Sequence, residues 1–304
     1  MVAVMDESHH SVVDNASTRN DTQAIRGIEV LNTGWAEQHR EHRYGSWMPQ
    51  LMWVLASRSW VKLPLQAFLI HHQSGPVLFD TGVDPALVGD PDYISQAIGR
   101  WLLRRIFRFD INKTDSLRSQ LNAIGVSPGD IRKAVISHLH FDHVGGIADV
   151  PNAELLVSDQ EWAQLSTPHP EHEWILREHI EIPGAKWRPI TFEPTDDAVL
   201  ARFGGTFDVM GDGSIMLIPT PGHTSGSLSM LVRSDGMAPV LFVGDLTYEA
   251  RLIFEDRVPG TGDNKTLRQT YAKVRALKAD LPDMVILASH DPSASESLQH
   301  ALRP

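Results

Sequence analysis

A histidine-rich stretch in the middle of the chain constrains this sequence more than any other feature. It runs from 137 to 146 as SHLHFDHVGG and holds four potential metal ligands within six positions: His138, His140, Asp142 and His143. The apolar residues 134–136 before it indicate a buried strand, and the Gly pair at its end indicates a turn. We therefore expect the four side chains where a rigid strand opens into a loop, a frequent position for a functional site.

The spacing of these side chains allows two metal sites. His138 and His140 are two residues apart, so an extended backbone directs both to the same side. Asp142 and His143 are adjacent where the chain turns, so they point apart and can serve a second ion. Imidazole and carboxylate groups are good ligands for zinc and similar divalent cations. A polar loop with chance histidines is the alternative, but the density and order of the cluster favour metal binding.

The motif His138-X-His140-X-Asp142-His143 resembles the signature of the metallo-β-lactamase superfamily. That family also needs a His, an Asp and a further His downstream. The chain offers His223 in PTPGHT, Asp245 in FVGD and His290 in LASHD, each after a short apolar run. The resemblance implies that one metal is held by His138, His140 and His223, and a second by Asp142, His143 and His290. It implies that Asp245 bridges the two.

The order of the predicted elements fits one α/β domain. Strand-like runs at 64–70, 77–80, 154–158 and 228–232 are interleaved with helical patterns such as 266–281. The resemblance implies the αβ/βα four-layer sandwich of the metallo-β-lactamase fold. We expect residues 25–304 to form a single hydrolase domain, 1–24 to be a disordered tail, 34–50 to be a long loop, and the Pro-rich stretch 160–206 to be an insertion near the site.

An amphipathic segment at 93–109 has no assigned role from the sequence. Its apolar residues, among them Ile98 and Trp101, recur at helical spacing beside four arginines. The stripe fits ordinary core, an acyl-binding pocket or a dimer face, while a membrane contact is disfavoured because the segment is short and isolated. The resemblance implies homodimers, and Trp101 and the 34–50 loop are candidates for the dimer face.

Composition excludes several classes of function. The net charge of −11, from 38 acidic and 27 basic residues, disfavours a nucleic-acid or anionic-membrane partner, which requires a basic surface. The sequence contains no Cys, so disulfides and thiolate metal ligands are excluded. This fits a cytoplasmic protein. Neither a signal peptide nor a membrane-spanning apolar run is expected.

The expected chemistry is hydrolysis. Two divalent ions about 3.5–4 Å apart can share a hydroxide, and zinc lowers the pKa of its water to about 7. Tyr248 lies three residues after Asp245 and resembles a tyrosine of the N-acyl-homoserine lactonase branch, where it donates a hydrogen bond to the substrate. The resemblance implies a quorum-quenching lactonase that opens the lactone ring by attack of a metal-bridging hydroxide, with two zinc ions and with Asp142 and Tyr248 as candidate catalytic residues.

Three alternatives stay open from the sequence. The same metals can hydrolyse another ester, an organophosphate or a thioester. The fold can also serve a non-enzymatic binding role, although the complete ligand set disfavours this. Tyr248 can be a core residue whose hydroxyl bonds elsewhere. Asp80, in the turn Asp80-Thr81-Gly82, is interpreted as a carboxylate that bonds to the backbone of its turn.

Overall fold

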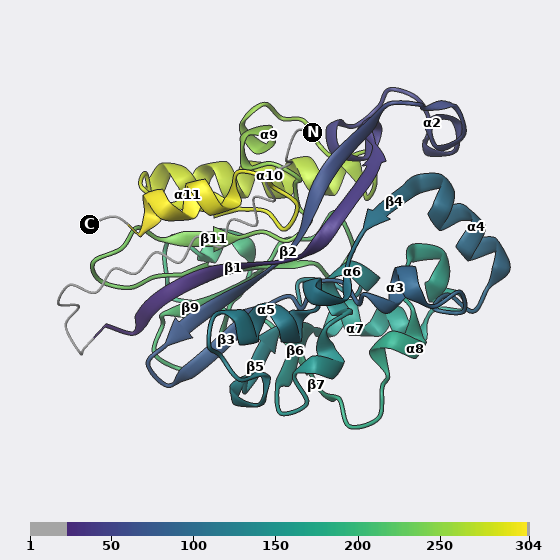
Figure 1. Ribbon diagram of the computed structural model, residues 1–304. Helices are drawn as coiled ribbons and strands as arrows, with labels where there is room; N and C mark the ends of the chain where they lie inside the picture. Colours follow the sequence, from purple (N-terminus) through teal and green to yellow (C-terminus); the bar gives the residue numbers. More distant parts are fainter. Residues whose placement is uncertain (1–22, 303–304) are drawn as a thin grey trace, which may run out of the picture.

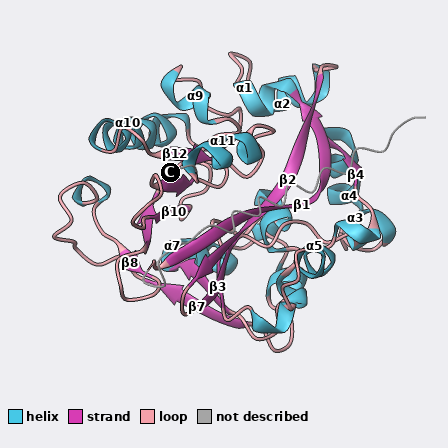
Figure 2. Ribbon diagram, turned by 60° about the vertical axis from the view of Figure 1, so that its left-hand side comes forward, coloured by secondary structure: helices cyan, strands magenta, loops and turns pink. Residues whose placement is uncertain are grey.

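Two stacked β-sheets with helices on both outer faces form the molecule (Figures 1 and 2). The computed structural model describes residues 23–302, so all but residues 23 and 24 of the expected tail at 1–24 lie outside the described residues. The succession of helix, sheet, sheet and helix confirms the predicted four-layer α/β sandwich. Within the described range, no helix is long and apolar enough to cross a membrane.

The larger sheet has seven strands in the order β4-β1-β2-β3-β5-β6-β7. Their bounds are β1 (Ile25–His39), β2 (Trp60–His72), β3 (Gly75–Phe79), β4 (Phe107–Asp110), β5 (Lys133–Val135), β6 (Glu154–Ser158) and β7 (Lys186–Ile190). β2 and β3 form an antiparallel hairpin, whereas β3, β5, β6 and β7 run parallel. Parallel strands present their carboxyl ends at one edge of a sheet, which is where ligands bind in open α/β sheets.

The smaller sheet has five strands in the order β12-β11-β10-β9-β8. Their bounds are β8 (Phe207–Asp208), β9 (Ile215–Pro219), β10 (Leu228–Val232), β11 (Val240–Phe242) and β12 (Val285–Leu287). β8 and β9 pair antiparallel, and β11 and β12 pair parallel. β9, β11 and β12 each lead into one of the downstream candidate ligands.

Helices cover the two outer faces and the edge that carries the site. Their bounds are α1 (Arg40–Tyr44), α2 (Gln50–Ala56), α3 (Ala86–Gly89), α4 (Ala97–Ile106), α5 (Leu117–Ala123), α6 (Phe141–Val144), α7 (Asp159–Ala163), α8 (Arg177–Ile180), α9 (Ala250–Phe254), α10 (Asn264–Asp280) and α11 (Ala294–Ala301). α10 begins at a capping aspartate, because the Asp263 side chain accepts a hydrogen bond from the Thr266 amide.

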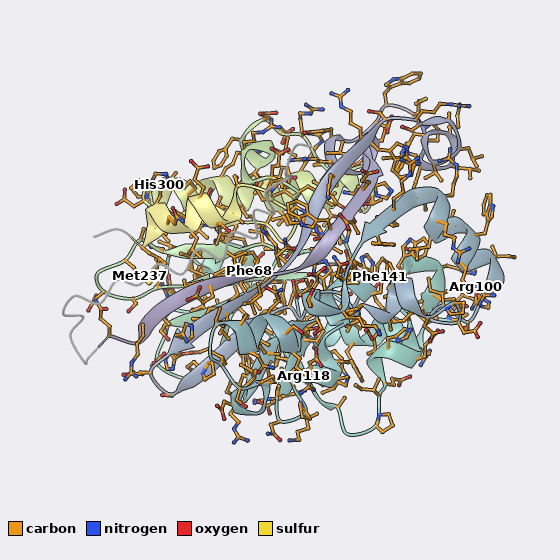
Figure 3. The ribbon with its side chains drawn as sticks, viewed as in Figure 1. Phe68, Arg100, Arg118, Phe141, Met237 and His300 are labelled. Carbon is orange, nitrogen blue, oxygen red and sulfur yellow. The ribbon has the colours of Figure 1, made fainter. Side chains whose placement is uncertain are left out.

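Apolar side chains from both sheets meet in the middle of the sandwich. Phe68 of β2 and Phe79 of β3 pack on Phe242 of β11, with ring centroids 4.9 and 5.6 Å apart (Phe68 is labelled in Figure 3). A second core joins α5 to the outer face of the larger sheet, and a third joins α10 to the smaller one. This packing fixes the edge where the strand ends converge.

Two local expectations, for 34–50 and for 93–109, differ from the structure. The stretch 34–50 is not a long loop, because β1 continues to His39 and is followed by α1. The predicted helix at 93–109 is shorter, since its last residues pair with β1 as β4. The stretch 160–206 contributes an edge strand, β7, to the larger sheet, and residues 172–174 line the cavity described below.

Candidate metal centre

All seven predicted ligands come together at one edge of the sandwich. His138 follows β5, His223 follows β9, Asp245 follows β11 and His290 follows β12. His140 precedes α6, and this short helix carries the last two ligands, Asp142 and His143. The seven side chains make up three overlapping groups, in each of which the potential ligand atoms lie within 4.8 Å of one another.

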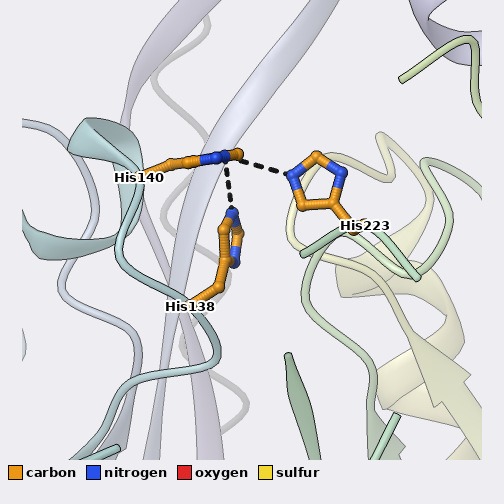
Figure 4. A group of neighbouring side chains, drawn as sticks. All are labelled: His138, His140 and His223. Atoms are coloured by element: carbon orange, nitrogen blue, oxygen red, sulfur yellow. Dashed lines mark hydrogen bonds between the residues drawn. The ribbon is translucent and has the colours of Figure 1, made fainter. Parts of the chain in front are cut away.

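Three imidazoles form the first group (Figure 4). His140 Nδ1 lies 3.0 Å from His138 Nε2 and 3.1 Å from His223 Nε2. Four ligands at zinc–nitrogen distances of 2.0–2.1 Å in a tetrahedron are separated by about 3.3 Å. The three nitrogens therefore stand close to the spacing that a single tetrahedral cation imposes.

The second group joins Asp142, His143 and His290, and Asp245 lies between the two groups. Oδ1 of Asp245 is 3.1 Å from His290 Nε2 and 3.3 Å from His143 Nε2. Its other oxygen, Oδ2, is 3.5 Å from His223 Nε2 in the first group. One carboxylate thus faces both groups with different oxygens, which is the arrangement of a bridging ligand.

Hydrogen bonds on the far side of each ring determine which nitrogen faces the centre. His143 Nδ1 donates to Asp80 Oδ2 at 2.8 Å, and His290 Nδ1 donates to the Pro64 carbonyl at 2.9 Å. His138 Nδ1 donates to Ser137 Oγ, which in turn donates to Asp80. In all three rings the Nε2 lone pair is left for a cation, because the proton stays on Nδ1.

Unpaired buried atoms support the presence of cations. His143 Nε2 and Asp245 Oδ1 are buried, and neither has a hydrogen-bond partner among the described residues. Leaving buried polar atoms unpaired costs free energy, so such atoms are rare in folded proteins. A divalent ion would satisfy both atoms, so the residues fit the metal centre that the sequence predicts.

The electrostatics of the first group favour neutral, ligand-competent rings. Burial lowers the pKa of His140 to about 4 and that of His223 to about 3. Burial also acts to lower the pKa of His143, but the carboxylates of Asp245 and Asp80 outweigh it and raise that pKa. The second group therefore carries the excess negative charge that a cation neutralises.

Two buried carboxylates near the ligands were not assigned a role in the site by the sequence. Asp80 accepts from the Ser137 amide at 2.7 Å as well as from His143, so its interpretation as a turn residue is incomplete. Glu161 of α7 accepts from the Leu139 amide at 3.0 Å and from Thr224 Oγ1 at 2.6 Å. It thus joins the loop of His138 to the loop of His223. The one available signal was that Asp80, like the ligands, follows a strand.

Tyr248 stands at the wall of a cavity of about 770 Å³ that opens beside the centre. Its side chain is buried, and its ring stacks on His290 with centroids 5.4 Å apart. Burial, followed by the carboxylates of Asp245 and Asp142, raises the pKa of its phenol well above the ordinary value. The hydroxyl therefore stays protonated at neutral pH and can donate a hydrogen bond into the cavity.

Comparison with known proteins agrees with this geometry. The family model of the metallo-β-lactamase superfamily matches residues 62–290. The N-acyl homoserine lactonase AttM of Agrobacterium fabrum is 30% identical over 251 residues, which cover 79% of this chain and 86% of that protein. A probable metallo-hydrolase of Mycobacterium tuberculosis is 30% identical over 254 residues and 76% of each chain.

Solved structures share the fold. An N-acyl homoserine lactone hydrolase with N-hexanoyl-L-homoserine at its catalytic metal center superposes with a TM-score of 0.70 and 20% identity, over 90% of this chain and 96% of that one. AidC, a dizinc quorum-quenching lactonase, gives a TM-score of 0.60 at 17% identity, over 90% of this chain and 92% of that one. The four-layer fold, the candidate ligands at its strand ends and these similarities lead to one conclusion. The chain belongs to the metallo-β-lactamase superfamily, in the branch of the N-acyl homoserine lactonases.

Proposed function

We propose that this protein hydrolyses the lactone ring of N-acyl-homoserine lactones and is a quorum-quenching enzyme. The observation that carries the proposal is the position of Tyr248, a protonated phenol next to Asp245 and on the wall of a large cavity. The relatives named as N-acyl homoserine lactonases support the same substrate class. The reaction adds water to the ring carbonyl, breaks the ester carbon–oxygen bond and yields the N-acyl-homoserine.

The seven candidate ligands are proposed to hold two zinc ions, the first at His138, His140 and His223 and the second at Asp142, His143 and His290, with Asp245 between them. Divalent cations in these positions would supply a nucleophile from water at neutral pH and would polarise the substrate carbonyl. The fit of the residues supports this assignment: neutral imidazoles face one position, and carboxylates with two imidazoles face the other.

Tyr248 and Asp142 are proposed to act on the substrate. Tyr248 donates a hydrogen bond to the carbonyl oxygen, where negative charge develops in the transition state. Asp142 lines the cavity, and 16% of its side chain is exposed, so its carboxyl group can reach the ring oxygen. It takes up the proton that the attacking water loses and passes it to this oxygen as the ring opens, since an alkoxide is a poor leaving group without one.

The test compares substrates on metal-loaded protein. We expect turnover of short- and long-chain N-acyl-homoserine lactones, followed by release of acid at constant pH. An aryl ester, an organophosphate and a thioester form the comparison panel, because the same centre can activate water for each. Faster turnover of one of these than of any acyl-homoserine lactone would contradict the substrate class. Inactivity across the whole panel would favour a binding role on the same fold.

The assembly of the protein is proposed from its exposed apolar side chains. Trp101 of α4 is 60% exposed, and Leu51 and Leu55 of α2 are also exposed. The two helices adjoin, since an Arg105 guanidinium nitrogen donates to the Leu55 carbonyl at 2.6 Å. This apolar surface is proposed as the face of a homodimer. A cytoplasmic location stays a prediction of the sequence.

A further inference from the structure

A second group of potential metal ligands lies outside the seven candidate ligands. His169, Glu171 and His172 each offer one atom, and these atoms lie within 4.8 Å of one another. The three residues belong to the stretch between α7 and α8, where a short 3₁₀-helix spans Pro170–Glu173 and His169 directly precedes it. Every other group of this kind among the described residues belongs to the metal centre, so this group has no role yet.

The local backbone brings the two imidazoles together. The His172 amide donates to the His169 carbonyl at 3.1 Å, and this hydrogen bond closes the turn. Side chains three residues apart eclipse in a 3₁₀-helix, so the two rings project to the same side. Their centroids are 5.0 Å apart and their planes differ by 21°. Buried Pro170 anchors the turn, because its carbonyl accepts from the Ile175 amide at 3.2 Å.

A carboxylate completes the group. Glu171 Oε1 lies 3.2 Å from His169 Nδ1, and Glu171 forms no ion pair with a lysine or arginine of residues 23–302. Hydrogen bonds from its own backbone amide and from the Gln96 side chain lower the pKa of the Glu171 carboxyl to about 2. The group therefore carries a negative charge at neutral pH, and a cation between Glu171 and His169 takes the place of the proton in their hydrogen bond.

Unlike the buried metal centre, this group is open to water. The side chain of His169 is 66% exposed and that of Glu171 is 26% exposed, and His172 is exposed as well. Two imidazoles and one carboxylate are a known donor set for zinc, with water in the fourth position. Imidazole ligands favour zinc, copper or nickel over magnesium and calcium. Because water competes for the ion at this surface, we expect weaker binding here than at the centre.

The residues that follow connect this group to the cavity beside the metal centre. His172, Glu173 and Trp174 line that cavity. The Glu173 backbone is also a hydrogen-bond partner of the His140 ring in the first group of ligands. Trp174 packs on Phe141 with ring centroids 6.2 Å apart, and its φ of 62° is a left-handed conformation that bulky residues rarely adopt. A cation on the turn would therefore stabilise a strained part of the cavity wall.

We propose that His169, Glu171 and His172 form an accessory site for zinc or a similar divalent transition metal, and that the bound ion fastens the cavity wall at 172–174. The inference goes beyond the proposed function and does not depend on it, because none of the three residues is among the seven candidate ligands. The accessory ion exchanges with the solution and is lost on gel filtration, whereas the ions of the buried centre remain.

Zinc titration of reconstituted and gel-filtered protein, followed by isothermal titration calorimetry, tests the site. Wild type is expected to take up one further zinc ion per chain at this site, and calcium is expected not to bind there. In His169→Asn and in Glu171→Gln the affinity for this ion is expected to fall at least about tenfold, since loss of even an indirect partner of a metal costs about 10- to 100-fold. Neither residue lines the cavity, so the metal content after gel filtration is expected to match wild type.

Hydrogen exchange measured by mass spectrometry tests the effect on the cavity wall. Excess zinc is expected to slow the exchange of the amides at 171–175 in wild type and not in Glu171→Gln. His300→Asn is the matched control. His300, labelled in Figure 3, is an exposed histidine of α11 that belongs to none of the ligand groups, so this variant is expected to bind the accessory ion as wild type does.

Three outcomes would count against the inference. Equal zinc uptake in wild type, His169→Asn and Glu171→Gln would place the further ion elsewhere on the chain. Absence of any further uptake by wild type would mean that the three side chains form a hydrogen-bonded surface turn and nothing more. Uptake that both variants lose, without slower exchange at 171–175 in wild type, would overturn the effect on the cavity wall.

Discussion

At the scale of single residues, Asp80 has the widest influence on the centre. Its carboxylate accepts from the His143 ring, from the Ser137 amide and from the Ser137 hydroxyl. Ser137 in turn accepts from His138, so one buried carboxylate orients a ring in each metal group. Partners of this kind fix the tautomer of a ligand and raise its basicity.

Replacing Asp80 by Asn is expected to weaken metal binding. Asn preserves the size and one carbonyl oxygen, but it can present an amide donor to His143, which then loses its fixed tautomer. We expect the affinity for metal to fall about 10- to 100-fold. Competition with a chromophoric chelator measures this directly. A variant that retains metal at the same chelator concentration as wild type would show that Asp80 has only a structural role.

Buried histidines are expected to make the metal-free protein sensitive to acid. Burial lowers the folded-state pKa of His42 and His223 to about 3 and that of His140 to about 4. Below the unfolded value of about 6.5, the unfolded chain binds more protons than the folded one at these positions. The free energy of unfolding therefore falls as the pH drops from about 6.5 to 4, by up to about 1.4 kcal/mol per pH unit for each histidine.

Denaturant unfolding of chelated protein across this pH range measures the effect, and His42→Phe is expected to reduce the slope. His42 is the informative position because it is not a candidate metal ligand. His143, whose pKa is raised, is protonated in both states within this window, so it does not offset the trend. A free energy of unfolding that is constant between pH 6.5 and 4 would contradict the assigned protonation states.

At the scale of elements, α7 connects the two ligand loops through Glu161. The carboxylate accepts from Leu139 in one loop and from Thr224 in the other. The contact is close, since a Cβ built on Gly226 would lie 2.1 Å from the Glu161 amide nitrogen. The relative position of His138 and His223 therefore depends on this helix as well as on the two sheets.

Glu161→Ala is expected to lower the free energy of unfolding by about 2–4 kcal/mol, because it leaves buried donors in both loops without an acceptor. Urea unfolding gives the value. Glu181→Ala, which removes an exposed carboxylate from an ion pair with Arg177, serves as the control and is expected to change stability by less than about 0.5 kcal/mol. A similar loss of unfolding free energy in the two variants would mean that Glu161 does not hold the two ligand loops together.

The comparison of sequence and structure also belongs at this scale. The ligands could be predicted because each follows a short apolar strand and because imidazoles and carboxylates have a restricted chemistry. The bounds of β1, which ends at His39, could not be predicted. They depend on pairing with β2 and β4 and not on the apolar pattern of β1 itself. Asp80 and Glu161 were missed as site residues for the same reason: their hydrogen-bond partners lie far away in the sequence.

At the scale of the whole molecule, the apolar surface on α2 and α4 remains unpartnered in a single chain. Most of the large exposed apolar side chains of the described residues lie in this region: Trp47, Leu51, Met52, Leu55, Ile98 and Trp101. Monomeric proteins rarely expose a contiguous apolar patch of this kind.

Light scattering on the purified protein is expected to give about twice the chain mass of 33.8 kDa. The double variant Leu51→Glu/Trp101→Glu is expected to give the mass of one chain, because it places charges of the same sign in the contact. Phe254→Glu, on α9 and away from this surface, is the control and should remain dimeric. A wild-type mass of one chain would contradict the dimer.

The central claim is that seven side chains from distant parts of the sequence hold two catalytic metal ions. The most direct test is the number of metal ions per chain, measured by mass spectrometry on zinc-reconstituted protein. Hydrolysis of an N-acyl-homoserine lactone is measured on the same samples. We predict two ions per active wild-type chain, about one in His290→Ala, and loss of hydrolysis in that variant. A wild-type chain that hydrolyses the lactone at full rate after its metal has been removed, or that binds no metal when zinc is in excess, would contradict the claim.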